Sequence, residues 1–188
     1  MTLAVAVSGG MDSLLALALL KERGGDLLAV HGFFLPQKNE DTAARLAGQC
    51  AALSIPFHAL DLRKQFQAQV ADGFVEAYAQ GRTPNPCAQC NPVMKFGALF
   101  DAARSLGANR FATGHYARLL DHPDLGRLLV RGADPAKDQS YFLSLVPKAL
   151  LEQAVFPLGD LHKAAVPGEL ARRGLTVPLP GESQEICF

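Results

Sequence analysis

Short apolar runs alternate with longer, helix-like segments over the first two thirds of the chain, and this rhythm restricts the fold more than any other feature. The apolar runs, which we interpret as buried β-strands, are Leu3–Val7, Leu27–Phe34, Pro56–Leu60 and Arg110–Thr113. The segments between them, interpreted as helices, are Asp12–Arg23, Asp41–Leu53, Leu62–Ala79 and Val93–Leu106. Strands alternating with helices form right-handed βαβ units around a parallel sheet. Ligands of such sheets bind at the carboxyl ends of the strands.

Beyond Gly114 the alternation weakens, and the pattern predicts smaller elements. These are a short strand at Arg127–Arg131, helices at Gln139–Leu145, Pro147–Ala154 and Lys163–Arg173, and a final extended stretch at Glu182–Phe188. Pro167 fits poorly within the early turns of this last predicted helix, because proline has no N–H to donate. We therefore divide the chain into a main domain, residues 1–135, and a helical extension, residues 136–188.

Composition favours a globular domain without a membrane-spanning segment. Of the 188 residues, 49% are hydrophobic and 19% are charged, which argues against disorder. No apolar run approaches the ~20 residues that cross a bilayer, and no basic leader precedes the first strand, so we expect a cytoplasmic location. The formal charge is zero, whereas nucleic-acid-binding proteins usually carry a basic excess; a local basic patch is still compatible with this balance.

A glycine-rich loop, Ser8–Ser13, joins the first strand to the first helix. This position directs backbone N–H groups and a helix N-terminus at an anion, although the loop has no lysine and is not a GxxxxGK[ST] loop. The bland interpretation is a glycine turn capped by Asp12 or Ser13. The loop resembles the SGGxDS motif of the ATP-pyrophosphatases, which split ATP between the α- and β-phosphates. That resemblance implies pyrophosphate binding by Ser8, Gly9, Gly10 and Ser13, with Asp12 at the phosphate or its Mg²⁺.

Five further blocks resemble, in the same order, the tRNA 2-thiouridylases (tRNA-uridine 2-sulfurtransferases). They are Gly81–Asn91, Ala112–Arg118, Lys137–Leu143, Phe156–Leu161 and Ser183–Phe188. The resemblance implies an α/β, adenine nucleotide α-hydrolase-like (Rossmann-like) fold with a mostly parallel five-stranded sheet. Residues 1–135 would form the ATP-pyrophosphatase (PP-loop) domain, and the small helical extension would carry the second active-site cysteine.

The same resemblance implies a reaction. ATP and Mg²⁺ would be used to adenylate a uridine of tRNA, at wobble position 34, and sulfur would then replace the activated oxygen. A persulfide carrier protein or inorganic sulfide would donate the sulfur. Cys90 matches the family's nucleophile, and Cys187 matches the cysteine that receives sulfur as a persulfide. Thiolates are the reactive form, so both cysteines need some exposure.

Cys87 departs from the family pattern, because many members have an aspartate three residues before the nucleophile. A thiol is a poor substitute for a carboxylate at neutral pH. The resemblance leaves two interpretations open for Cys87, Cys90 and Cys187: ligands of a [4Fe–4S] cluster with one open iron, or a persulfide relay with an extra thiol. A zinc site lacking its fourth ligand is a third. Cys50 has buried helical spacing and is expected to be an inert core thiol.

Other residues are assigned to the site through the same blocks. Gly114 and His115 would lie at the nucleotide, the backbone of Leu35 would contact adenine, and Lys137 would face the polyphosphate or the RNA backbone. Arg82, Lys95 and Arg118 form a possible basic rim. Family members continue past the second cysteine into β-rich domains that hold tRNA, so we expect such domains or a separate RNA-binding chain to assist. Rival interpretations are a sulfurtransferase for a non-tRNA acceptor and a sulfur or iron–sulfur carrier.

Overall fold

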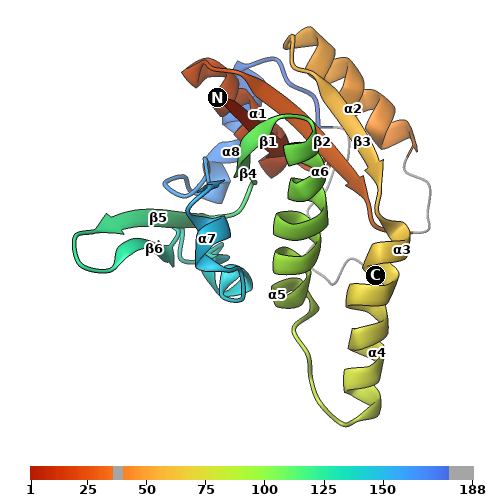
Figure 1. Cartoon of the computed structure of the whole chain (residues 1–188). Helices are drawn as coiled ribbons and strands as arrows, with labels where there is room; N and C mark the ends of the chain where they lie inside the picture. The colour runs from red at the N-terminus through yellow and green to blue at the C-terminus, as the bar shows by residue number, and fades with distance from the viewer. Residues whose placement is uncertain (36–39, 178–188) are drawn as a thin grey trace.

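The structure is a computed structural model that describes residues 1–35 and 40–177 (Figure 1). The predicted extended stretch Glu182–Phe188, which includes Cys187, lies outside the described residues.

The centre of the molecule is a five-stranded parallel sheet with the order β3-β2-β1-β4-β7. Its strands are β1 (Thr2–Ala6), β2 (Leu27–Phe33), β3 (Phe57–Asp61), β4 (Ala108–Ala112) and β7 (Ala154–Val155). Val5 of β1 pairs with Ala29 on one side and with Ala112 on the other. The chain runs outward from β1 to β3 and then returns to β4 on the opposite side of β1. The strand order therefore reverses between β1 and β4, where α/β sheets bind ligands.

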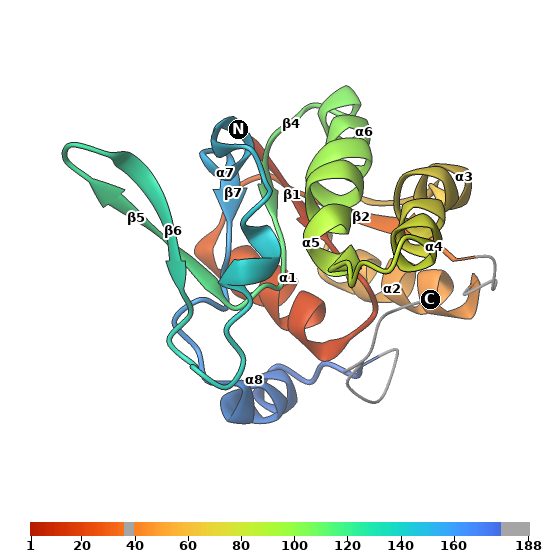
Figure 2. The same cartoon turned by 90° about the horizontal axis from the view of Figure 1, so that it is seen from below.

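Helices cover both faces of this sheet (Figure 2). On one face, α1 (Met11–Arg23) and α2 (Glu40–Ala52) bury Leu17 and Leu46 against Val5 and Ala29. On the other face, Phe66, Met94 and Phe100 belong to the core cluster that contains Ala4 and Phe111. Neighbouring residues of a strand point to opposite faces, so Ala4 and Val5 enter different layers.

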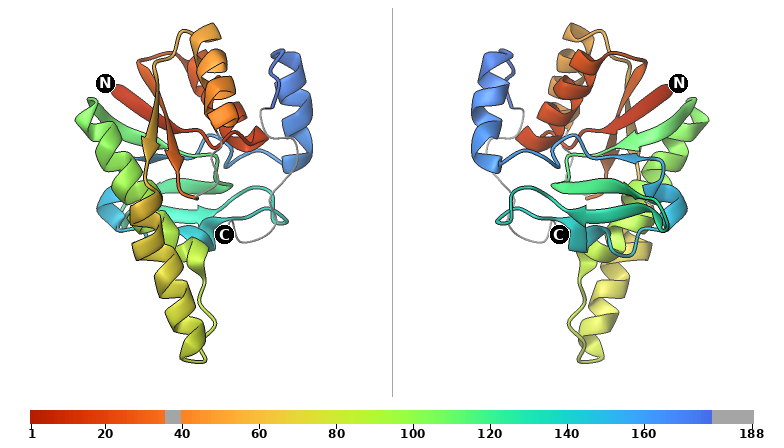
Figure 3. Two further views of the ribbon diagram at one scale, coloured as in Figure 1. Left: turned by 90° about the vertical axis from the view of Figure 1, so that its right-hand side faces the viewer. Right: turned by 90° about the vertical axis from the view of Figure 1, so that its left-hand side faces the viewer.

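Two long helical runs form the second layer. The first consists of α3 (Arg63–Phe66), the π-helix η1 (Gln67–Ala71) and α4 (Asp72–Ala79). The second consists of α5 (Pro86–Cys90), the π-helix η2 (Asn91–Leu99) and α6 (Phe100–Ser105). Figure 3 shows α4 and the connection to α5 projecting beyond the sheet.

The start of the predicted helix Val93–Leu106 was wrong, because the second run begins earlier, at Pro86. Asn85 caps the helix, because its Oδ1 accepts a hydrogen bond from the amide of Ala88 at 3.1 Å. Pro86 occupies the first turn, where a proline is tolerated. Cys87 and Cys90 therefore lie in helical turns and not in a loop before the helix.

The remaining elements lie beside this core. The predicted strand Arg127–Arg131 is confirmed as β6 (Gly126–Arg131), but it forms an antiparallel hairpin with β5 (Ala117–His122), which the sequence analysis missed. Two predicted helices are shorter than expected: η3 (Ser140–Leu143) and α7 (Lys148–Leu151). The predicted helix Lys163–Arg173 is confirmed as a 3-10 turn, η4 (Lys163–Ala165), that continues directly into α8 (Val166–Arg172). Pro167 is accommodated because it lies in the first turn of α8.

The predicted helix Pro147–Ala154 ends early, and its last residue begins β7, which pairs with Phe111 and Ala112 of β4. The fifth strand of the sheet therefore comes from beyond residue 135, and the division at that residue stays a prediction. Within the described ranges, no helix combines the length and apolar character needed to cross a membrane.

Candidate active site

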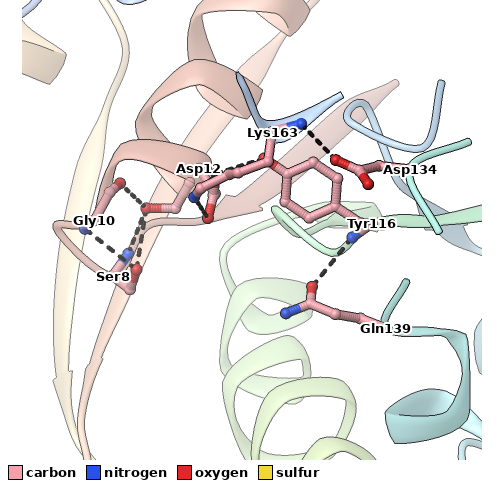
Figure 4. Close-up of polar contacts among 8 residues, drawn as sticks. Ser8, Gly10, Asp12, Tyr116, Asp134, Gln139 and Lys163 are labelled. Atoms are coloured by element: carbon pink, nitrogen blue, oxygen red, sulfur yellow. Dashed lines mark hydrogen bonds and ion pairs between the residues drawn. The ribbon is translucent and has the colours of Figure 1, made fainter. Parts of the chain in front are cut away.

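The Ser8–Ser13 loop connects β1 to α1 and includes the first residues of α1. Its serine side chains form hydrogen bonds with its own backbone (Figure 4). The hydroxyl of Ser13 accepts a hydrogen bond from the Ser8 amide at 3.0 Å and donates one to the Gly10 carbonyl, also at 3.0 Å. Gly9 has a φ of 92°, a conformation that side chains disfavour. Asp12 is in the first turn of α1, next to the helix N-terminus. The local geometry is therefore that of an anion-binding loop.

Gly114, which follows β4, presses against this loop. A Cβ atom added to Gly114 would lie 3.0 Å from the Asp12 carbonyl carbon and 3.0 Å from the Ser13 nitrogen. Only a residue without a side chain lets the two segments approach this closely. The segment that follows β4 therefore packs directly against the Ser8–Ser13 loop.

A cavity of about 340 Å³ opens beside the loop, at the carboxyl ends of the central strands. One wall is mainly apolar and includes Gly32, Phe33, Phe34, Leu35 and Leu99. The polar wall, formed by other lining residues, includes Ser8, Asp12, Ser13, Lys95, His115 and Gln139. The volume falls within the ~300–1,000 Å³ typical of small-molecule sites. A cavity that combines apolar residues with the anion-binding loop suits a ligand with an aromatic base and phosphates.

His115 is buried within the polar wall and is held in one protonation state. Burial, and then the Lys95 ammonium, lower the pKa of His115 well below its ordinary value. Its Nδ1 lies 2.7 Å from the Thr113 hydroxyl, and its Nε2 lies 3.4 Å from Lys95 Nζ. Because an ammonium can only donate, Nε2 accepts from Lys95 and Nδ1 carries the ring proton. The imidazole therefore orients the Lys95 cation at the cavity.

Asp12 has two partners that the sequence analysis did not identify (Figure 4). Lys163 Nζ lies 2.6 Å from both carboxylate oxygens of Asp12, and the Tyr116 hydroxyl donates to Asp12 Oδ1 at 2.7 Å. The backbone amide of Lys163 donates to Asp134 Oδ2 at 2.9 Å, and this bond is the main cause of the lowered pKa of Asp134. Lys163 follows the Phe156–Leu161 block, so its proximity to that block was the available clue.

The CxxC pair lies on the helical run that also supplies part of the cavity wall. Cys87 and Cys90 are partly buried and do not line the cavity, whereas Lys95 and Leu99, further along the same run, do. Asn91, 2% exposed, donates from Nδ2 to the carbonyls of Cys87 at 3.0 Å and Phe142 at 3.1 Å. The turn that carries the cysteines is thereby fixed to η3.

The other predicted site residues fall into three groups. Ser8, Asp12, Ser13, Leu35, Gly114 and His115 line the cavity, and Gly9 and Gly10 complete the loop beside it. Lys137 does not line the cavity; two positions later, Gln139 does, and its side chain accepts from the Tyr116 amide at 3.1 Å. Of the possible basic rim, only Lys95 reaches the cavity, since Arg82 donates to Gln80 and Arg118 to the carbonyl of Arg131.

The third predicted active-site thiol, Cys187, lies outside the described residues. Within residues 1–35 and 40–177, no three His, Cys, Asp or Glu side chains are grouped to hold a metal ion. Cys50, a residue of α2, is fully buried, and burial raises its pKa to about 11, which agrees with an inert core thiol.

A parallel sheet with a glycine-rich anion loop at its switch point defines a Rossmann-like nucleotide-binding domain. The particular family follows from sequence: the model described as the tRNA methyl transferase HUP domain matches residues 1–188, and the chain belongs to that family. It is 58% identical over 194 residues to the tRNA-specific 2-thiouridylase MnmA of Nitratidesulfovibrio vulgaris, and 51% identical over 190 residues to that of Lawsonia intracellularis. Both alignments cover 100% of this chain, with 55% and 54% of the relatives. The chain thus spans about half the length of these curated relatives, and the predicted resemblance to the 2-thiouridylases is confirmed.

Solved structures confirm the predicted fold. The U34-tRNA thiolase NcsA of Methanococcus maripaludis, solved with its [4Fe–4S] cluster, matches with a TM-score of 0.62 and 16% identity, over 100% of this chain and 61% of that one. A glutamine-dependent NAD⁺ synthetase of Acinetobacter baumannii, in complex with ADP, matches with a TM-score of 0.53 and 14% identity, over 92% of this chain and 28% of that one. At these identities the likeness concerns the fold alone.

Proposed function

We propose that the chain is the catalytic part of a tRNA-uridine 2-sulfurtransferase that uses ATP to replace a uridine oxygen with sulfur at wobble position 34. Relatives 58% identical carry the name tRNA-specific 2-thiouridylase, which supports the reaction class. The observation that carries the proposal is a single cavity lined both by the Ser8–Ser13 loop and by Lys95, which lies on the helical run that bears Cys87 and Cys90. An activated phosphate and a reactive thiol can meet only where such elements adjoin.

The proposed nucleotide would place its phosphates at the polar wall and its base at the apolar wall. The Ser8, Gly9, Gly10 and Ser13 segment would bind the pyrophosphate, and the backbone near Leu35 would face the adenine. Gly114 and His115 would lie between them. Asp12 would hold Mg²⁺, which, when bound, neutralises the polyphosphate. The first step then joins a uridine carbonyl oxygen to the α-phosphorus and releases pyrophosphate.

Sulfur transfer follows the persulfide route in this proposal. The terminal sulfur of a Cys187 persulfide attacks the adenylated carbon, and AMP leaves with the former carbonyl oxygen. The Cys90 thiolate then attacks the inner sulfur, so that a Cys90–Cys187 disulfide forms and the thiolated base is released. An external reductant thiol restores both cysteines, and a persulfide carrier protein then transfers its outer sulfur to the Cys187 thiolate and leaves as a thiol. Inorganic sulfide would enter before this reduction: it attacks the Cys187 sulfur of the disulfide, which forms the Cys187 persulfide and releases the Cys90 thiolate.

A [4Fe–4S] cluster on Cys87, Cys90 and Cys187 is the competing proposal for the sulfur chemistry. Such clusters take three or four cysteine thiolates, and the described part of the site supplies two, Cys87 and Cys90. The third thiolate would be Cys187, which lies outside the described residues and which the persulfide route also requires. Anaerobic purification decides the matter: a colourless protein with full thiolation activity excludes the cluster. A brown protein that loses its colour in the Cys87→Ser variant would replace the persulfide route.

The proposed reaction is tested in two stages with unmodified tRNA transcripts. ATP–pyrophosphate exchange reports adenylation, and nucleoside mass spectrometry reports 2-thiouridine. We expect Asp12→Asn to abolish both, and Cys90→Ser to keep exchange and lose 2-thiouridine. Cys50→Ala is the matched control, because its thiol is buried outside the site. Absence of RNA-stimulated exchange in the wild-type chain, alone or with added RNA-binding domains, would contradict the proposal.

The acceptor has its own test, because the chain has no net basic charge. Filter binding of tRNA across a salt series measures how many phosphate contacts form. We propose that further RNA-binding domains or a partner chain provide many of these contacts. Thiolation of a small molecule or protein in place of tRNA would favour a non-tRNA acceptor. Nucleotide binding without exchange would favour a carrier role.

A further inference from the structure

The contact between Asp12 and Lys163 is the closest pairing of opposite charges at the cavity. The Lys163 ammonium lies 2.6 Å from each carboxylate oxygen of Asp12. The side chain of Asp12 is 29% exposed and that of Lys163 is 13% exposed. The pair is therefore largely withdrawn from water but still open toward the cavity that Asp12 lines. The Tyr116 hydroxyl fixes the same carboxylate from another side at 2.7 Å.

The backbone around Lys163 is held in place from two directions. Asp134 accepts hydrogen bonds from the amides of Lys163 and Ala136, at 2.9 Å and 3.0 Å. The following helix, α8, buries Val166 and Leu170 against the cluster that contains Leu14 and Leu15 of α1. The backbone is thus anchored, whereas the ammonium is carried on a stem of four flexible carbons. The charge can move by side-chain rotation while the fold stays unchanged.

A divalent cation on Asp12 must compete with this ammonium. Mg²⁺ binds carboxylate oxygens at about 2.0–2.1 Å, and Lys163 already approaches both oxygens of Asp12. Two cations that share these oxygens repel each other at short range. Polyphosphate bound by the adjacent Ser8–Ser13 loop would give the displaced ammonium new acceptor oxygens.

We propose that Lys163 is the counter-ion of Asp12 when no nucleotide is bound, and that it moves to the polyphosphate when the magnesium nucleotide enters. The proposal rests on nucleotide binding at the proposed site, and it adds a phosphate-positioning lysine from the extension. Lys163 thereby prevents a free divalent cation from occupying Asp12 before the nucleotide arrives.

This role predicts two effects of opposite sign for Lys163→Met, which keeps most of the side-chain length. Affinity for Mg²⁺–ATP should fall about tenfold or more, because a charge-assisted hydrogen bond to phosphate is lost. Affinity for Mn²⁺ alone should rise about threefold or more, because the competing cation is gone. If Lys163 only stabilised the loop, Lys163→Met would lower the affinity for Mg²⁺–ATP and the affinity for Mn²⁺ alike.

The experiment measures Mg²⁺–ATP binding by titration calorimetry and Mn²⁺ binding by electron paramagnetic resonance. Lys21→Met, at the far end of α1 and exposed, is the matched control and should change neither affinity. The gain in Mn²⁺ affinity should vanish in the double variant Asp12→Asn/Lys163→Met. Lys163→Gln is measured in parallel, and its affinities decide the outcome if Lys163→Met does not fold.

Two results would overturn the role of Lys163: equal ATP binding in wild type and variant, or unchanged or weaker Mn²⁺ binding in the variant. A wild-type chain that binds no ATP would overturn both this role and the proposed function. ATP binding without thiolation of any RNA would leave the role of Lys163 intact and would count against the proposed function alone.

Discussion

Asn91 offers a direct way to test how the cysteines are positioned. Its side-chain amide is almost fully buried and donates two hydrogen bonds, one to the Cys87 carbonyl in its own helical run and one to the Phe142 carbonyl in η3. Each such bond contributes about 0.5–1.5 kcal/mol net, so Asn91→Ala should lower the free energy of unfolding by about 1–3 kcal/mol. For a chain of 188 residues this corresponds to a fall in Tm of about 2–12 °C.

The assay is urea unfolding of Asn91→Ala beside Asn109→Ala, an exposed asparagine of β4 whose replacement should have little effect. Release of the turn from η3 should also increase the alkylation rates of Cys87 and Cys90, measured by mass spectrometry of iodoacetamide-labelled peptides. If Asn91→Ala is as stable as Asn109→Ala and its thiols react at the wild-type rate, the amide does not position the cysteines.

Three further perturbations test other parts of the site. Gly114→Ala should lower the free energy of unfolding by about 1–3 kcal/mol and weaken nucleotide binding, because its Cβ would lie 3.0 Å from two backbone atoms of the Ser8–Ser13 loop. Urea unfolding and titration calorimetry measure the two effects. At pH 8.5, iodoacetamide should label Cys87 and Cys90 and spare Cys50, whose pKa is raised by burial to about 11; rapid labelling of Cys50 in the folded protein would contradict its burial. The pKa of His115 is lowered in the folded state, so the unfolded state binds more protons below about pH 6.5. Stability should therefore fall with pH below that value, by up to about 1.4 kcal/mol per unit, and His115→Gln should flatten the pH profile of urea unfolding.

The longer strands of the sheet and the position of the Ser8–Ser13 loop could be predicted from sequence because their determinants are local. The apolar runs Leu3–Val7 and Leu27–Phe34 coincide with β1 and β2 to within one residue at each end, and the Ser8–Ser13 loop follows the first as expected. The early start at Pro86 was also readable, since an asparagine cap followed by proline is a local helix signature. β7 was not, because a two-residue strand leaves no period to detect.

The partners of Asp12 could not be predicted in this way. Tyr116 and Lys163 lie 104 and 151 positions further along the chain, and only the fold brings them to the loop. Lys137 was predicted to face the polyphosphate or the RNA backbone because it lies in a matching block. In the structure, Lys95 lines the cavity and Lys163 contacts Asp12, whereas Lys137 does not line the cavity. The block containing Lys137 contributes the side chain of Gln139 to the cavity.

That block also connects the two chemical halves of the site. At one end, Gln139 exchanges two hydrogen bonds with the backbone of Tyr116, whose hydroxyl holds Asp12. At the other end, the Phe142 carbonyl accepts from Asn91, which is bonded in turn to the first turn of α5. The Phe142 amide also donates to the Gln139 carbonyl. A continuous set of hydrogen bonds therefore runs from Asp12 of the Ser8–Ser13 loop to the helix that bears the cysteines. Because the two ends depend on different bonds, Asn91→Ala should loosen the cysteines while leaving the affinity for nucleotide unchanged. A parallel loss of nucleotide affinity in that variant would show that the segment transmits strain along its whole length.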